Sequence, residues 1–182
     1  MLSTQPITRN FKDFGLFYEL YKSAFPKSER APMAFLFQRA KRDTIKFTAY
    51  YDEATFVGFS YTITVGDLTY LLYLATQMNI RSKGYGTQIL GNIQEQYPDN
   101  RIVLNIEIED EKAENNADRI RRKSFYLKNG YNLTKIYFEM NKNKFDVLTS
   151  NGTCTAEEFK LLFKTYMGTL PYAIYRPKIR DN

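Results

Sequence analysis

The sequence predicts an α/β fold with helices packed around one mixed β-sheet. Between residues 44 and 78, β-branched and aromatic residues form three apolar segments separated by short polar turns, which is the pattern of consecutive strands. Before and after this region, apolar residues recur every three or four positions, as they do along one face of an amphipathic helix. The order of helices, strands, a crossover helix and further strands indicates an α/β sandwich.

Two helices are expected near the N-terminus. The first covers residues 10–25 and ends at Pro26. Its aromatic residues are spaced by 3, 4, 3 and 4, on the positions Phe11, Phe14, Tyr18, Tyr21 and Phe25. The second, shorter helix begins near Pro32, with four inward positions: Met33, Leu36, Phe37 and Ala40.

The next three segments, "TIKFTAYY", "ATFVGFSYTITV" and "LTYLLYLATQM", predict consecutive antiparallel strands. The third, residues 68–78, is apolar at almost every position, which is typical of a central strand covered on both faces. A helix over 84–97 and a strand starting at Arg101 follow, so a β-helix-β unit spans about 69–108.

The remaining elements are a helix, a pair of strands and a last helix. Residues 115–129 predict a helix that stops at Asn129-Gly130. One face of it carries an apolar stripe, and Arg119, Arg122 and Tyr126 lie opposite. The stripe consists of Ala117, Ile120, Ser124 and Leu127. After a strand pair, a capping box of Thr155 and Glu158 begins a helix over about 155–167.

Composition excludes several classes of chemistry. The chain has 182 residues, enough for one domain, with no histidine and a single cysteine, Cys154. Histidine-based nucleophile systems are therefore absent and no metal site is expected. The apolar runs are too short for a membrane span and the N-terminus lacks a signal-peptide pattern, so we expect a cytoplasmic protein. The net charge of +6 favours an anionic ligand, whether a phosphorylated small molecule or nucleic acid.

The stretch "NIRSKGYGTQIL", residues 79–90, has the features of a phosphate-binding turn. Gly84 and Gly86 allow close approach of the backbone to a ligand, and the following helix directs unpaired N–H groups at the turn. The Walker pattern is absent, and Ile89 occupies the position of the third glycine of a dinucleotide fingerprint. A third pattern, R-x-x-G-x-G, fits "RSKGYGT" at residues 81–87.

This third pattern resembles the acetyl-CoA loop of the GNAT superfamily of N-acetyltransferases. "SFYLKNGY", residues 124–131, is similar to a segment near the end of a later helix in that family, and "SAFPKSERAP", residues 23–32, is similar to the opening loop of bacterial members. The resemblance covers roughly residues 10–150. It departs from the family at Arg119, where many relatives carry asparagine.

The resemblance implies a single acyl-CoA N-acyltransferase domain over residues 1–182, with a mixed, mostly antiparallel sheet flanked by helices on both faces. It implies acetyl-CoA as cosubstrate and a primary amine as acceptor. A polyamine, an amino acid, an antibiotic and a protein N-terminus all remain open as acceptors, and the carboxylates of the chain favour a small cationic molecule. Homodimers are common in the family, so a homodimer is a further expectation. The implied cofactor-binding residues are Leu74, Thr76, Met78, Arg81, Ser82, Lys83, Gly84, Tyr85, Gly86 and Thr87.

Tyr126 is the candidate general acid. In the family motif this tyrosine protonates the departing thiolate, and a phenol with a pKa near ~10 can protonate a thiolate with a pKa near ~8.5. Alternatively, Tyr126 is an aromatic residue that only packs in the core. The neighbouring Phe125 can take that packing role instead.

Three carboxylates are candidates for handling the amine. Glu107 and Glu109 lie two apart at a strand end and therefore on the same side, where they could serve as base or bind a cation, or else form a solvated edge. Glu107 is the better candidate base. Glu109 is a candidate for binding a cationic acceptor. Glu29, in the opening loop, is a second candidate, although the sequence favours a surface residue at this position.

Two other functions remain open from the sequence. The first is a non-catalytic GNAT domain that binds acyl-CoA, which an assay of thiol release with an amine would distinguish. The second is a nucleic-acid-binding module, favoured by the net charge and by "RIRRK" at 119–123. Stacking aromatics do not alternate with that run, so an amphipathic helix explains it better.

Overall fold

The computed structural model describes residues 2–80, 83–141, 143–175 and 177–181. The chain forms two compact units, and each is described by itself. The first contains Met1–Thr64 and Leu71–Pro98, and the second contains Val65–Tyr70 and Asp99–Asn182. Within the described residues, the strands form an eight-stranded sheet in the order β1-β2-β3-β4-β5-β7-β6-β8. The predicted α/β class with a mixed, mostly antiparallel sheet is confirmed.

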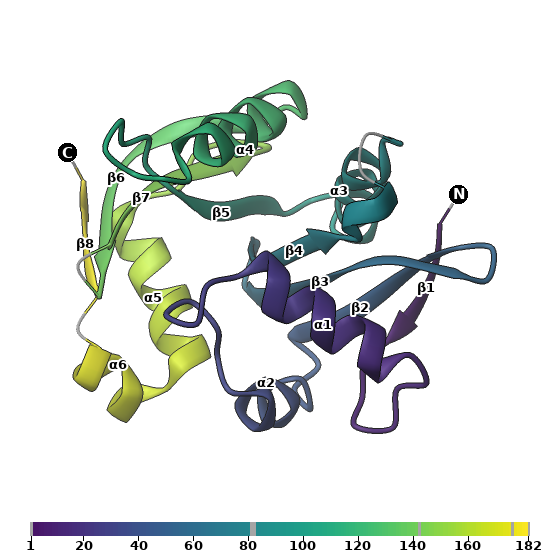
Figure 1. Ribbon diagram of the computed structural model, residues 1–182. Coiled ribbons are helices and arrows are strands. Elements are labelled where there is room, and N and C mark those ends of the chain that lie inside the picture. The colour runs from purple at the N-terminus through teal and green to yellow at the C-terminus, as the bar shows by residue number, and fades with distance from the viewer. Residues whose placement is uncertain (1, 81–82, 142, 176, 182) are drawn as a thin grey trace. The chain divides into compact units, whose positions relative to one another are not determined.

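The first unit contains the N-terminal helices, strands and glycine turn (Figure 1). Its strand β2 pairs antiparallel with both β1 and β3. The elements are β1 (Ser3–Pro6), α1 (Phe14–Ala24), α2 (Met33–Arg39), β2 (Ile45–Asp52), β3 (Thr55–Val65), β4 (Leu68–Thr76), a short 3₁₀ helix (Met78–Ile80) and α3 (Tyr85–Gln96). The last residue of β3 and the first three of β4 belong to the second unit.

Aromatic side chains join α1 to the sheet of the first unit. The Phe17 ring packs edge-on against Phe47 of β2 and Phe59 of β3, with ring centroids 5.2 and 5.0 Å apart. The predicted buried face of this helix was partly wrong, because Phe17 and Leu20 are buried whereas Tyr18 is 37% exposed. Since α3 packs on the opposite face of β3, at Gly58, helices cover both faces of this part of the sheet.

The second unit consists of a strand layer between α4 and α5 (Figure 1). β5 pairs in parallel with β4 through Leu68–Tyr70 and antiparallel with β7, which in turn pairs antiparallel with β6. The predicted β-helix-β unit, the strand pair and the capping box at Thr155 are confirmed. The elements are β5 (Arg101–Glu107), α4 (Asn116–Lys128), β6 (Asn132–Met140), β7 (Asn143–Ser150), α5 (Ala156–Met167), α6 (Thr169–Tyr175) and β8 (Lys178–Asp181).

Helix α4 is turned the opposite way from what its apolar stripe suggests. All four stripe residues are exposed, Ile120 at 44% and Leu127 at 43%. The polar face packs on the sheet instead, where Arg119 pairs with Glu107 of β5 and Lys123 pairs with Asp146 of β7. Charge pairing therefore orients this helix. In the part of the chain that the structure describes, no helix has the length and apolar character needed to cross a membrane.

Candidate functional site

The glycine turn of the first unit has the backbone geometry of an anion-binding turn. Gly84 is the N-cap of α3 with a φ of +78°, in the left-handed region that glycine adopts at little cost. Gly84 has no side chain that could cap the helix. The space beside it is open, because a Cβ added to Gly84 would meet no atom within 4 Å. The first bond of the helix ladder runs from the Gln88 N–H to the Gly84 carbonyl, at 3.1 Å. The preceding N–H groups of the first turn can therefore donate to a bound anion.

Most of the predicted cofactor residues in this turn are brought together by α3. Gly86 and Thr87 lie in its first turn, and Lys83 is exposed just before it. Arg81 and Ser82 lie outside the described residues. The Tyr85 hydroxyl donates to Asp52 Oδ2 at 2.6 Å, and this hydrogen bond raises the pKa of Tyr85. The bond ties the start of α3 to the turn between β2 and β3.

The strand that leads into the turn supplies the other predicted cofactor positions. Leu74 and Thr76 lie two apart in β4 and point to the same face of the sheet, where both are half-buried. The predicted strand was two residues too long, because β4 ends at Thr76. Met78 lies in the 3₁₀ helix that follows and is 60% exposed.

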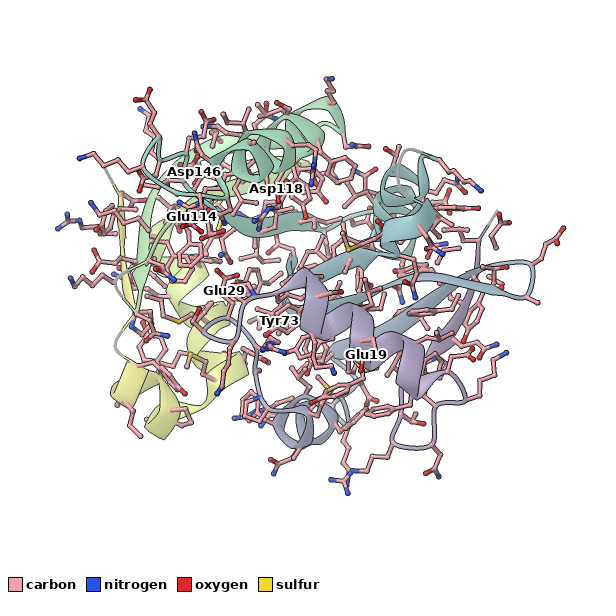
Figure 2. The ribbon with its side chains drawn as sticks, in the orientation of Figure 1. Glu19, Glu29, Tyr73, Glu114, Asp118 and Asp146 are labelled. Carbon is pink, nitrogen blue, oxygen red and sulfur yellow. The ribbon has the colours of Figure 1, made fainter. Side chains whose placement is uncertain are left out.

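Glu29 lies in a loop that is held by two buried tyrosines, Tyr73 of β4 and Tyr21 of α1 (Figure 2 labels Glu29 and Tyr73). The Tyr73 hydroxyl donates to the Glu29 carbonyl at 2.8 Å and accepts from the Ala31 N–H at 3.0 Å. The Tyr21 hydroxyl donates to the Ala31 carbonyl at 2.9 Å. Because Tyr73 directly precedes Leu74, the loop is held at the strand that carries the predicted cofactor positions. Neither tyrosine was predicted for this role, since a loop contact at this separation leaves no local pattern.

Tyr126 lies in the second unit, on the face of α4 that packs inward. Its ring lies edge-on to Tyr131, with centroids 5.6 Å apart, and to Phe125, 5.1 Å away. Part of its surface remains accessible, yet burial raises the pKa of Tyr126 to about 12, while the Arg122 guanidinium acts in the opposite direction. The phenol is therefore fully protonated at neutral pH, as a proton donor must be.

Glu107 occupies the centre of a charged cluster between β5 and α4. Its Oε1 is 2.8 Å from Arg119 Nη2 and its Oε2 is 3.2 Å from Arg122 Nη2, and the side chain is only 11% exposed. Asn115 also donates to Oε2, at 3.2 Å. Sequence spacing could not reveal these partners, because a loop separates the strand from the helix.

Glu109, the other carboxylate of the predicted pair, belongs to a second ion-pair group. Lys123 Nζ lies 3.2 Å from Glu109 and 3.1 Å from Asp146 (Figure 2 labels Asp146). Burial opposes the charge of Lys123, but the hydrogen bonds to Asp146 and Glu109 outweigh it and raise its pKa. The two predicted carboxylates thus take different partners along α4. Among the described residues, no group of three potential ligands is arranged to hold a metal ion.

Comparison with known proteins decides the family. A model of the acetyltransferase (GNAT) family matches residues 14–131, which is more than half of the chain. The chain belongs to the GNAT family. The matched span contains the glycine turn, Glu107 and Tyr126. A comparison with curated protein sequences finds no match for this chain.

Solved structures of GNAT proteins have the same fold. A protein described as a GNAT-family acetyltransferase from Bacteroides thetaiotaomicron is 22% identical with a TM-score of 0.72, covering 95% of this chain and 98% of that one. The aminoglycoside 6'-N-acetyltransferase from Enterococcus faecium is 16% identical with a TM-score of 0.61, covering 81% and 96%. A GNAT acetyltransferase from Elizabethkingia anophelis, solved with acetyl-CoA bound, is 14% identical with a TM-score of 0.58, covering 82% and 97%.

Proposed function

We propose that this GNAT protein is an N-acetyltransferase that moves the acetyl group of acetyl-CoA to a primary amine of a small cationic acceptor. The observation that carries the proposal is the left-handed Gly84 at the start of α3, at the end of the connection from β4 to α3. Such a turn suits the pyrophosphate of coenzyme A, because successive backbone N–H groups and the helix dipole favour an anion. A solved GNAT neighbour holds acetyl-CoA, which supports the choice of cosubstrate.

The residues of the first unit would bind the cofactor. The N–H groups of residues 82–87 would hold the pyrophosphate, with charge from Arg81 and Lys83. The backbone of Leu74–Met78 would pair with the amides of the pantetheine arm as an added strand does. An N–H group there would also donate to the thioester oxygen, which gains negative charge when the amine attacks.

The chemistry would pass through a tetrahedral intermediate. The neutral amine attacks the thioester carbon, the C–N bond forms, and the C–S bond breaks to release the thiolate. Tyr126 protonates this thiolate, since its phenol keeps its proton at neutral pH. Both carboxylate oxygens of Glu107 already accept hydrogen bonds from guanidinium groups, so we assign the removal of the ammonium proton to water.

The acceptor would be drawn toward carboxylates. Glu29 and Glu109 are proposed to bind a cationic amine, and the E. faecium neighbour is named for an aminoglycoside, a cationic amine of this kind. The basic run at residues 119–123 had favoured nucleic-acid binding, but its side chains form ion pairs within the protein. Four basic side chains of this run form salt bridges with carboxylates: Arg119, Arg121, Arg122 and Lys123.

Isothermal titration with acetyl-CoA tests the first half of the proposal. We expect micromolar binding to the wild type and its loss in Gly86→Trp, whose indole would block the turn. Thiol release is then measured with spermidine, lysine, kanamycin and a peptide with a free N-terminus. Tyr126→Phe should bind acetyl-CoA normally and lose about 10²-fold in kcat with the amine that reacts. Absence of wild-type binding would refute the proposal, and binding without thiol release from any amine would favour the non-catalytic alternative.

A further inference from the structure

The Glu107 cluster carries one cation more than it needs for neutrality. One carboxylate, Glu107, accepts hydrogen bonds from two guanidinium groups, at 2.8 Å from Arg119 and 3.2 Å from Arg122. The cluster therefore has a net charge of +1 in a place where its carboxylate is largely buried. The charge of the second guanidinium is therefore not neutralised within the cluster.

The two arginines are held in different ways. Arg119 is bound on three sides, because it also donates to Asn115 Oδ1 at 2.9 Å and to the Ile108 carbonyl at 2.9 Å. Its side chain is 15% exposed. Arg122 is 39% exposed, and Glu107 is its salt-bridge partner. Arg119 thus balances the carboxylate within the protein, and the charge of Arg122 is left over.

The remaining charge lies on the same face of α4 as Tyr126. Arg122 and Tyr126 are four residues apart in α4, so their side chains lie on one face of the helix, one turn from each other. Tyr131, from the turn before β6, is a second titratable group in contact with the Tyr126 ring. Lys123, on the neighbouring turn, is committed to Glu109 and Asp146. Among the described residues, Arg122 is the cation whose charge lowers the pKa of Tyr126.

We infer that Glu107 and Arg119 are positioning residues that hold the Arg122 guanidinium beside Tyr126, where it balances the phenolate left when Tyr126 gives up its proton. The inference rests on the proposed function. In the step concerned, the phenol O–H bond breaks, the thiolate sulfur gains the proton, and the negative charge moves to the Tyr126 oxygen until solvent returns a proton. A partly buried phenolate is costly without a nearby cation. Without Arg119, the Glu107 carboxylate would cancel that cation.

The test reads the acidity of residue 126 directly. 3,5-Difluorotyrosine, a more acidic analogue, is incorporated at position 126 and titrated by ¹⁹F NMR in the range where the protein stays folded. Arg122→Gln should raise the apparent pKa of the fluorotyrosine by ~1, because a unit charge about one helix turn away is removed. Arg121→Gln is the matched control. Its guanidinium pairs with Asp118 on the exposed side, at 2.8 Å, and its removal should leave the titration unchanged.

Two further variants separate positioning from other roles. Arg122→Lys keeps the charge, so its titration should remain near that of the wild type. In a Glu107→Gln background, Arg122→Gln should have little further effect, because the guanidinium is no longer held in place. An unchanged pKa in Arg122→Gln would overturn the inference, and so would an equal rise in Arg122→Lys. A full effect of Arg122→Gln in the Glu107→Gln background would overturn the positioning role of Glu107.

The ¹⁹F measurement requires no acetyl transfer, so its outcome is independent of the proposed function. If acetyl-CoA fails to bind while the titrations behave as expected, the proposed function fails and the charge relationship stands. With a reactive amine in hand, kcat at pH 7 should fall about tenfold in Arg122→Gln and stay unchanged in Arg121→Gln.

Discussion

Gly58 of β3 lies so close to Ala75 of β4 that no side chain fits between them. A Cβ at position 58 would be 2.4 Å from the Ala75 carbonyl oxygen and 3.2 Å from Cδ1 of Ile89 in α3. Both the strand contact and the seating of α3 on the sheet therefore depend on a glycine at this position. The helix seated here is the one that begins at the Gly84 turn.

Gly58→Ala is expected to destabilise the protein by about 2–3 kcal/mol, because the new methyl group meets backbone rather than a flexible side chain. For a chain of this length, Tm should fall by roughly 4–12 °C. Gly91→Ala is the matched control within α3. Nothing lies within 4 Å of its added Cβ, and replacing a helical glycine should stabilise by about 0.5–1 kcal/mol. Equal melting temperatures for Gly58→Ala and the wild type would contradict the close approach.

Tyr73→Phe should loosen the loop that contains Glu29. The substitution leaves the Glu29 carbonyl and the Ala31 N–H without their hydroxyl partner, a local loss of about 1–3 kcal/mol. Cleavage by trypsin after Lys27 and Arg30 should become at least several-fold faster. Tyr18→Phe, which alters an exposed tyrosine of α1, serves as control and should be cut like the wild type. Equal cleavage of all three proteins would show that the hydroxyl does not hold the loop.

The ion pair of Arg101 and Glu158 should make the thermal stability of the protein depend on pH below about pH 5. Hydrogen bonds from Arg101 and from the Thr155 N–H lower the pKa of Glu158 to about 2. A carboxyl whose pKa is lower in the folded state stabilises the protein above its unfolded pKa of about 4.3, and this stabilisation is lost as the pH falls toward 2. The Tm advantage of the wild type over Glu158→Gln should therefore shrink between pH 5 and pH 2.

The exposed neighbour Glu157 provides the control for that series. Its side chain is 81% exposed and pairs with Lys160 on the same helix. Glu157→Gln should follow the wild type at every pH, because exposed pairs contribute little. A wild-type advantage over Glu158→Gln that stays constant from pH 5 to pH 2 would speak against the assigned ion pair.

Cys154 should react slowly with thiol reagents in the folded protein. The side chain is buried, and burial raises the pKa of its thiol to about 12. At pH 8 the reactive thiolate is then rarer than in a free cysteine by roughly three orders of magnitude. Ellman's reagent should label one thiol quickly in urea and only slowly in buffer. Rapid labelling in buffer would contradict the buried position.

Periodicity predicted most helices and strands of this chain but could not decide how they face the core. The helix predicted over 84–97 corresponds to α3, and the capping box at Thr155 starts α5 as expected. α4 shows the limit of the method, since its apolar stripe is exposed. Its orientation depends on Glu107 and Asp146, which lie on strands that a periodicity count treats separately from the helix.

The two strands that the sequence did not predict are short and polar. β1 spans Ser3–Pro6 with all four residues exposed, and β8 spans Lys178–Asp181 with only Ile179 buried. Such strands are formed by backbone hydrogen bonds to a neighbouring strand, so their own side chains carry little signal. For the candidate site, the motif residues could be named in advance. Their partners, such as Asp52 for Tyr85, come from distant parts of the chain.

The discontinuous second unit has a consequence for synthesis on the ribosome. Arg101 bonds backward to Asp67 and forward to Glu158, across 34 and 57 residues. The segment 65–70 therefore leaves the ribosome long before the strands and helix that complete its surroundings. Contacts between distant residues form slowly because a long loop must close first. Residues 65–70 are therefore exposed as a nascent chain before their later partners exist, and a chaperone that covered them would protect the chain during folding.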